Sequence, residues 1–543
     1  MKFKALNIFV TASMALTAAA QDLKTEVVVD RTVEPAERAA TRLGGLTPEL
    51  VLPVFEPVAI KPSIYNRLSP LTRSFTRLDP SAGPAAAEPS PYRGYAAIGY
   101  FPTLNIGVTG GYRIVETERF SFGIDAGYIC ESYDVPSGYY EDSNSLMLPS
   151  VNLDFGWRPN SRSAFSASAN YSFIRQSTSE WTHRKISAGG LNLGWKSSVG
   201  NLEYSAAVKG MFENALPAKA YKQPYESSGI SQQQYGFEAE GSLPVGALSR
   251  FGVAVEGDFV HTGAVTSPPD RADACTFGTV GVKPFYAIAT GSITARVGLK
   301  VDFATGGEGS KVHVAPDLWL QWAATPQFAV WADISGGDVV NSFSALRQIT
   351  QYQFLTRALG RSDVPVAADL GFNFGPFSGF SAQLFGGYAV ANEWLMLTGG
   401  VTTPWAATDV KGWHAGLRLG YEWRILSVNA SAEFAPSDYD KAWFRTYDRA
   451  STIISASARV TPFSKFSIGA GYEFRGGRKA FSGAENEYHL GCVSNLSATA
   501  DYKLSGSFTI FARVENMLSR RYEVVRWINS QGVHGLFGVE VKF

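Results

Sequence analysis

The sequence predicts an all-β protein: a transmembrane antiparallel β-barrel of about 22 strands, preceded by a short N-terminal periplasmic or lumenal segment. Two patterns support this fold class, a two-residue alternation of apolar and polar side chains and an alternation of short and long connections. The 543 residues include 54 glycines, 13% aromatic and only 18% charged residues, and their mean hydropathy is −0.04. Such averages suit strands that have one lipid-facing and one water-facing side.

The start of the chain reads as an export signal. Lys2 and Lys4 precede an apolar run from Ala5 to Leu16, and small residues follow before Gln21. We therefore predict a signal peptide over 1–20. No later stretch offers the ~20 apolar residues of a membrane-crossing helix, so the exported chain can enter a membrane only as strands, which places it in the outer membrane of a Gram-negative bacterium.

Residues 21–92 differ from the rest of the chain. They are rich in proline and alanine and keep no sustained period, as in VEPAERAATRLGG and LDPSAGPAAAEPSP. We expect this segment to lie in the periplasm or inside the lumen, and the barrel to occupy 93–543.

The alternation is clear in the last strand. Phe537, Val539, Val541 and Phe543 fall on one face, while Gly538, Glu540 and Lys542 fall on the other. A well-patterned strand at the terminus is expected to pair on both sides, with its sequence neighbour and with the first strand near 94–101. That pairing would close the barrel.

Connections alternate in length along the predicted barrel. Short ones include 116–119, 158–162, 198–201, 324–327, 462–465 and 504–507, and longer polar ones include 134–144, 214–230, 337–363 and 435–450. Short periplasmic turns and long outer loops are typical of outer-membrane barrels. A barrel of about 22 strands has a wide bore, so residues 21–92, the loop 337–363 or a partner chain is expected to fill it.

Near the end of the chain, the stretch FTIFARVENMLSRRY (508–522) and the terminal strand resemble the last two strands of TonB-dependent receptor barrels. The resemblance implies substrate binding or transport across the outer membrane. That family carries a larger plug domain ahead of its barrel than residues 21–92 provide. A passive porin and a non-transporting structural or assembly partner of other envelope proteins therefore stay open as alternatives.

A second resemblance lies just after the predicted leader. Thr25, Glu26, Val27, Val28 and Val29 resemble a TonB box, an extended apolar segment that a periplasmic TonB-like protein captures by adding a strand. The same short run also fits a plain periplasmic tail.

Four carboxylates are candidates for a binding wall in the lumen. Glu238 and Glu240 lie on one predicted strand, Glu256 and Asp258 on the next, and the short PVGALSR connection brings them side by side. Lumenal carboxylates can select cations or pair with a basic plug. They also occur as ordinary solvated lumen residues.

Enzymatic and nucleic-acid functions find no support in the sequence. The glycine-rich ATGGEGSK (304–311) lacks the Gly-Lys-Ser/Thr order of a phosphate loop, and the six histidines show no metal-ligand spacing. Lys+Arg and Asp+Glu are equal at 48 each, which disfavours nucleic acid. We predict no enzyme activity, cofactor or metal site, and as partners outer-membrane lipid and a periplasmic TonB-like or other envelope protein.

Overall fold

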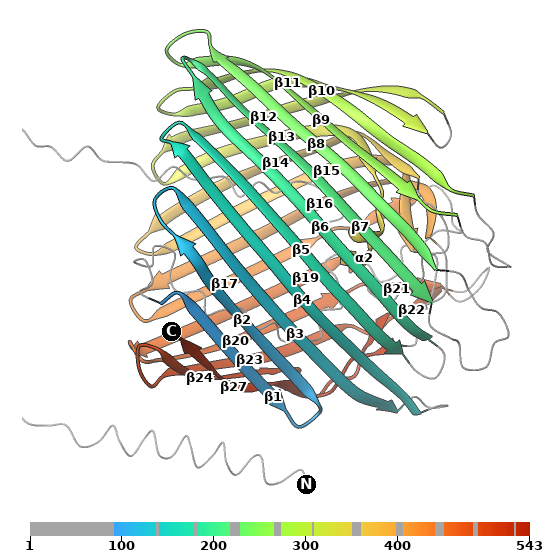
Figure 1. The fold of residues 1–543 in the computed structure, drawn as a ribbon, viewed down its shortest axis with the longest axis vertical. Coiled ribbons are helices and arrows are strands. Elements are labelled where there is room, and N and C mark those ends of the chain that lie inside the picture. The colour runs from blue at the N-terminus through green and yellow to red at the C-terminus, as the bar shows by residue number, and fades with distance from the viewer. Residues whose placement is uncertain are drawn as a thin grey trace, which may run out of the picture. The chain divides into compact units, whose positions relative to one another are not determined.

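A computed structural model of the chain describes residues 92–543, and these residues form a closed β-barrel (Figure 1). The description omits 137–140, 179–181, 218–228, 265–272, 307–308, 350–359, 398–404, 440–449, 482–486 and 526–527. The predicted signal peptide and the TonB-box-like residues Thr25 to Val29 lie outside the described residues, as does all but the last residue of 21–92.

The barrel consists of 22 antiparallel strands, as the sequence predicts. In chain order they are β1 Gly94–Phe101, β2 Asn105–Glu116, β3 Phe120–Pro136, β4 Glu141–Asn160, β5 Ser163–Thr178, β6 Thr182–Val199, β7 Leu202–Pro217, β8 Ile230–Pro244, β9 Ser249–Thr262, β10 Cys275–Ala289, β11 Ile293–Gly306, β12 Lys311–Thr325, β13 Phe328–Val340, β14 Arg361–Phe377, β15 Phe380–Leu397, β16 Trp405–Trp423, β17 Leu426–Phe434, β19 Thr452–Phe463, β20 Phe466–Gly476, β23 Val493–Lys503, β24 Phe508–Glu515 and β27 His534–Lys542.

The described parts of the connections contain five short strands and one helix. Strand β18 (Ser437–Tyr439) pairs with β16, β21 (Lys479–Phe481) pairs with β22 (Glu487–His489), and β25 (Glu523–Val525) pairs with β26 (Ile528–Asn529). Helix α2 (Phe343–Ile349) joins β13 to β14. No helix in the described part of the chain is long and apolar enough to cross a membrane.

The two faces of each strand follow the sequence alternation. On β12, Val312 and Val314 are more than 60% exposed on the outer face, whereas His313 on the opposite face contacts carboxylates inside the barrel. Large exposed apolar side chains recur in this way along most strands. An outward apolar surface combined with inward polar contacts is the arrangement that a bilayer requires.

Short connections lie at one end of the barrel and long connections at the other. β2 and β3, β6 and β7, and β12 and β13 are each joined by two or three residues, whereas β7 to β8 and β13 to β14 are joined by long segments. By the usual orientation of such barrels, the long connections mark the outer end. We use "outer end" in this sense below.

Candidate functional site

The outer end of β13 separates from β12 and turns into the lumen, while β14 stays paired with β15 in the wall. β13 pairs with β12 only as far as Ile334 opposite Leu318, and then a bulge at Ser335–Gly337 shifts the register. Gly337 has φ +115°, and a Cβ there would lie 2.3 Å from Asp302 Oδ2. Only glycine fits this bend, because a side chain would collide with the wall. We call the segment 336–349 the inward hairpin arm.

Backbone and side-chain hydrogen bonds fix where the arm leaves the wall. The backbone N–H of Asp338 donates to Asp302 Oδ2 of β11 (2.8 Å), so the arm lies over β12 to reach β11. Asn341 Nδ2 donates to Gly360 O (3.0 Å) and to Ser362 Oγ (3.1 Å), which joins the two sides of the connection at its base.

At the tip of the arm, helix α2 is tethered to strands on another part of the wall. Ser342 Oγ accepts the backbone N–H of Ala345 (3.2 Å) and so caps the helix. The fully buried Phe343 donates its backbone N–H to Gln232 Oε1 of β8 (2.6 Å), and Arg347 Nη1 lies 3.2 Å from Glu213 Oε2 of β7. The arm therefore spans from β13 to β7 within the lumen.

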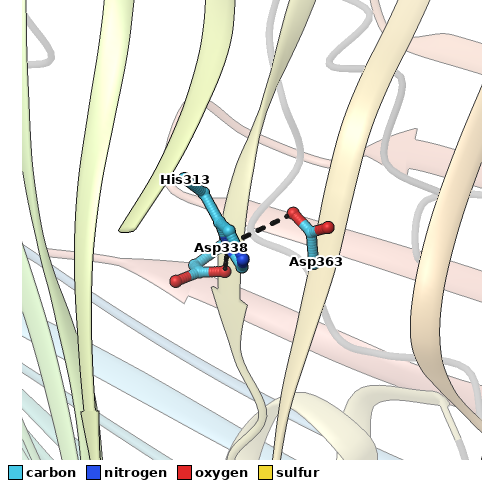
Figure 2. A group of neighbouring side chains, drawn as sticks. All are labelled: His313, Asp338 and Asp363. Atoms are coloured by element: carbon cyan, nitrogen blue, oxygen red, sulfur yellow. Dashed lines mark hydrogen bonds and ion pairs between the residues drawn. The ribbon is translucent and has the colours of Figure 1, made fainter. Parts of the chain in front are cut away.

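Three side chains of types that can ligate a metal ion meet where the arm passes β12. His313 Nδ1 of β12 lies 2.6 Å from Asp338 Oδ1 of the arm and 3.4 Å from Asp363 Oδ1 of β14. Figure 2 shows both contacts converging on one imidazole. We call His313, Asp338 and Asp363 the His–Asp–Asp cluster.

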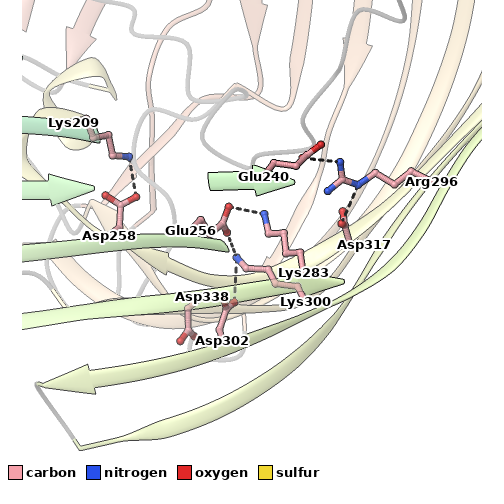
Figure 3. Close-up of polar contacts among 10 residues, drawn as sticks. All are labelled: Lys209, Glu240, Glu256, Asp258, Lys283, Arg296, Lys300, Asp302, Asp317 and Asp338. Atoms are coloured by element: carbon pink, nitrogen blue, oxygen red, sulfur yellow. Dashed lines mark hydrogen bonds and ion pairs between the residues drawn. The ribbon is translucent and has the colours of Figure 1, made fainter. Parts of the chain in front are cut away.

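The lumenal wall below the arm is a network of alternating charges across β7 to β12 (Figure 3). Lys300 Nζ lies 2.9 Å from Glu256 Oε1 and 3.1 Å from Asp302 Oδ2, and Lys283 Nζ lies 2.6 Å from Glu256 Oε2. Asp302 is 1% exposed, so its charge depends on Lys300 for compensation.

The four carboxylates singled out in the sequence lie together on this wall. Glu238 stands opposite Glu256 in the β8–β9 register. Glu240 pairs with Arg296 (3.2 Å), and Asp258 pairs with Lys209 (2.9 Å) and accepts a hydrogen bond from Gln234 (3.0 Å). Three of the four thus have cationic partners from the barrel itself, which the sequence did not predict because these partners come from strands β7, β10 and β11.

A cavity of about 450 Å³ lies between the arm and the wall. Glu238, Glu256, Asp258 and Lys209 line it from the wall, and Asp338 to Val340 line it from the arm. A volume of this size suits a small ligand. The cavity, its wall and the arm form the candidate functional site.

Sequence patterns did not reveal the path of the arm or the His–Asp–Asp cluster. Most of the arm belongs to the loop 337–363, one of three predicted candidates for filling the lumen, and no pattern indicated the inward bend at Gly337. The His–Asp–Asp cluster was missed because its members are 25 residues apart on separate strands, with no local spacing to reveal them.

The fold matches solved outer-membrane transporters, whereas no protein-family model and no curated protein sequence matches the chain. The FrpB iron transporter from Neisseria meningitidis has TM-score 0.66 at 13% identity over 83% of this chain and 81% of that chain. The copper transporter OprC (TM-score 0.64, 11% identity) and the siderophore receptor PirA from Acinetobacter baumannii (0.63, 10%) each match over 83% of this chain and 80% of theirs.

These similarities confirm at the level of the fold the resemblance to TonB-dependent receptor barrels that the sequence indicated. The described residues form a barrel of the kind found in the outer membrane of Gram-negative bacteria. At 10–13% identity the similarity shows the fold of the barrel and does not identify a solute.

Proposed function

We propose that this chain binds a small polar solute in the cavity under the inward hairpin arm and carries it across the outer membrane. The observation that supports this most directly is the arm itself, which joins β13 to β7 across the lumen and lines one side of a cavity of about 450 Å³. A barrel that only holds other envelope proteins together would not need a charged cavity inside its lumen.

The charges around the cavity indicate the kind of solute. Glu238, Glu256 and Asp258 contribute carboxylates, and Lys209 contributes an ammonium group from the same surface. Both signs lie within a few ångströms, since Lys209 and Asp258 are 2.9 Å apart. A solute with its own hydrogen-bond donors and acceptors can pair with these half-exposed charges, whereas a purely apolar one would displace water from them without replacing its hydrogen bonds.

Single-channel conductance of the purified full chain in a planar bilayer tests this proposal. Arg347→Ala removes the ion pair to Glu213 and should release the tip of the arm, so conductance should rise above that of the wild type. Arg459→Ala is the matched control, because Arg459 lies on β19, outside the β7–β14 wall. Equal conductance of the wild type and Arg347→Ala would show that the arm does not obstruct the lumen.

A passive pore is the second candidate function. The arm supports this function too, because a connection that folds into the lumen can narrow a wide bore even where no plug domain fills it. The two functions differ in the wild-type trace. A steady open conductance without any solute would identify a passive pore. A closed wild type that Arg347→Ala opens would support solute-dependent transport.

Energy coupling belongs to the proposal as well. Thr25, Glu26, Val27, Val28 and Val29 would present an extended strand to a periplasmic TonB-like protein, which would supply the energy for release of the solute. Local sequence supports this step, together with the fold that the barrel shares with known transporters.

A further inference from the structure

We propose that the His–Asp–Asp cluster binds one divalent first-row transition metal ion, with Zn²⁺ as the reference ion, and that this ion fastens the inward hairpin arm to the barrel wall. The site goes beyond the proposed transport function, since it concerns what holds the arm in place. His313 belongs to the wall, Asp338 to the arm and Asp363 to the strand that leaves the arm.

The donor atoms already converge on one point. His313 Nδ1 faces Asp338 Oδ1 at 2.6 Å and Asp363 Oδ1 at 3.4 Å, and the three donor atoms lie within 4.8 Å of one another. Zinc accepts imidazole nitrogen and carboxylate oxygen at about 2.0–2.2 Å, so small side-chain rotations can place an ion between them.

The two negative charges of the cluster favour binding of a cation. Asp338 and Asp363 are directly opposite each other in the β13–β14 register, where like charges destabilise a sheet. One Nδ1 proton can bridge only one of the two carboxylates well, and the side chain of Asp338 is only 2% exposed. A divalent ion that replaces this proton would neutralise both carboxylates at once.

Neighbouring groups hold each carboxylate in the orientation that ligation requires. Asn392 Nδ2 donates to Asp363 Oδ2 (2.9 Å), and Arg361 Nη1 lies 3.7 Å from Asp338 Oδ2. In both residues the outer oxygen Oδ2 faces the supporting group, which leaves Oδ1 directed to His313. Supporting contacts of this kind are typical of metal sites.

Asp338 Oδ2 is also a buried oxygen without a hydrogen-bond donor. Arg361 approaches it only at ion-pair distance, because Nη2 of that guanidinium donates to the carbonyls of Gly306 and Gly309. Among the described residues, the charge of the Asp338 carboxylate is therefore balanced only by one imidazole and by one guanidinium at 3.7 Å.

The donor set also selects the kind of ion. One imidazole and two carboxylates give three protein ligands, and a water molecule can complete a tetrahedral zinc site. Calcium requires six to eight oxygen ligands, so this cluster should bind it far more weakly.

Isothermal titration of the purified full-length barrel in detergent with ZnCl₂ tests the site. We expect one equivalent to bind to the wild type. His313→Ala and Asp363→Asn should each weaken Zn²⁺ binding by at least roughly 10–100-fold. Loss of a supporting residue already weakens metal binding by that factor, and these two residues are themselves ligands. His261→Ala is the matched control, because His261 also lies at the outer end of a strand but contacts Thr276 instead of a carboxylate.

Co²⁺ provides a second readout that does not depend on affinity. A visible absorption band of tetrahedral Co²⁺ in the wild type and its loss in His313→Ala would support the site, provided that both proteins stay heat-modifiable on a gel and are therefore folded. Zn²⁺ binding that His261→Ala reduces as much as His313→Ala, or no binding to the folded wild type, would overturn the proposal. Neither result depends on conductance, so transport and metal binding are judged separately.

Discussion

Gly94 and Phe543 exchange two backbone hydrogen bonds, with Gly94 N to Phe543 O at 2.8 Å and Phe543 N to Gly94 O at 2.9 Å. The ladder continues to Tyr100 opposite Phe537, so β1 and β27 close the barrel. A Cβ on Gly94 would lie 2.5 Å from the Phe543 ring, so glycine allows the aromatic side chain to pack at this seam. The pairing expected from the terminal alternation is confirmed.

Deleting Val541 to Phe543 should block assembly, because the truncation removes the end of the β1–β27 ladder and exposes the edge of β1. The measurement is heat-modifiability on a gel together with the amount of protein in the outer membrane. Phe543→Leu, which keeps the backbone pairing, serves as the control. A truncated protein that assembles at the normal level would show that the seam tolerates an open end.

The two faces of β19 should respond differently to an introduced arginine. Ala456 and Ser457 are adjacent and both exposed, Ala456 on the side of Ile454 and Ser457 on the side of Arg459. Ala456→Arg should cost about 2–4 kcal/mol because its charge enters lipid, whereas Ser457→Arg should cost less because its charge reaches the lumen. Refolding titrations into lipid measure both, and equal costs would contradict this assignment of faces.

Lys300→Met should destabilise the barrel by about 3–5 kcal/mol, because it leaves Asp302 buried without its cation. The double variant Lys300→Met with Asp302→Asn should recover much of this loss. Lys209→Met is the control, since the Lys209 side chain is 42% exposed and an exposed pair contributes about 0–1 kcal/mol. Unfolding by denaturant measures all three, and absence of recovery in the double variant would point to lost packing instead.

Deletion of residues 21–92 distinguishes the two intrachain candidates for filling the lumen. If the arm is the main obstruction, the deletion should change single-channel conductance less than Arg347→Ala does. The physical reason is that three wall residues, Glu213, Gln232 and Asp302, hold the arm in the lumen. A several-fold rise in conductance on this deletion alone would identify residues 21–92 as the principal plug.

Val28→Pro tests the TonB-box-like segment. Proline removes a backbone donor that an added strand needs, so capture by the periplasmic domain of a TonB-like protein should be lost. Co-purification with the full chain measures this, and Val28→Thr, which keeps the donor and the β propensity, serves as the control. Capture that survives Val28→Pro would rule out strand addition at this residue.

Local sequence patterns were sufficient to predict the barrel. The two-residue alternation, the alternating connection lengths and the patterned last strand are local properties, and they fix the strand number, the two faces and the closure of β27 on β1. The wall position of Glu238, Glu240, Glu256 and Asp258 followed from the same alternation.

The contacts inside the lumen depend on long-range packing and could not be predicted from local sequence. Phe343 and Gln232 are 111 residues apart, and His313 reaches Asp338 only because β13 bends inward at Gly337. Side-chain partners such as Lys300 and Asp302 depend on register and on the path of the arm, which are long-range properties. Local sequence periodicity carries no information about contacts made across an enclosed lumen. These contacts can be found only from the three-dimensional structure.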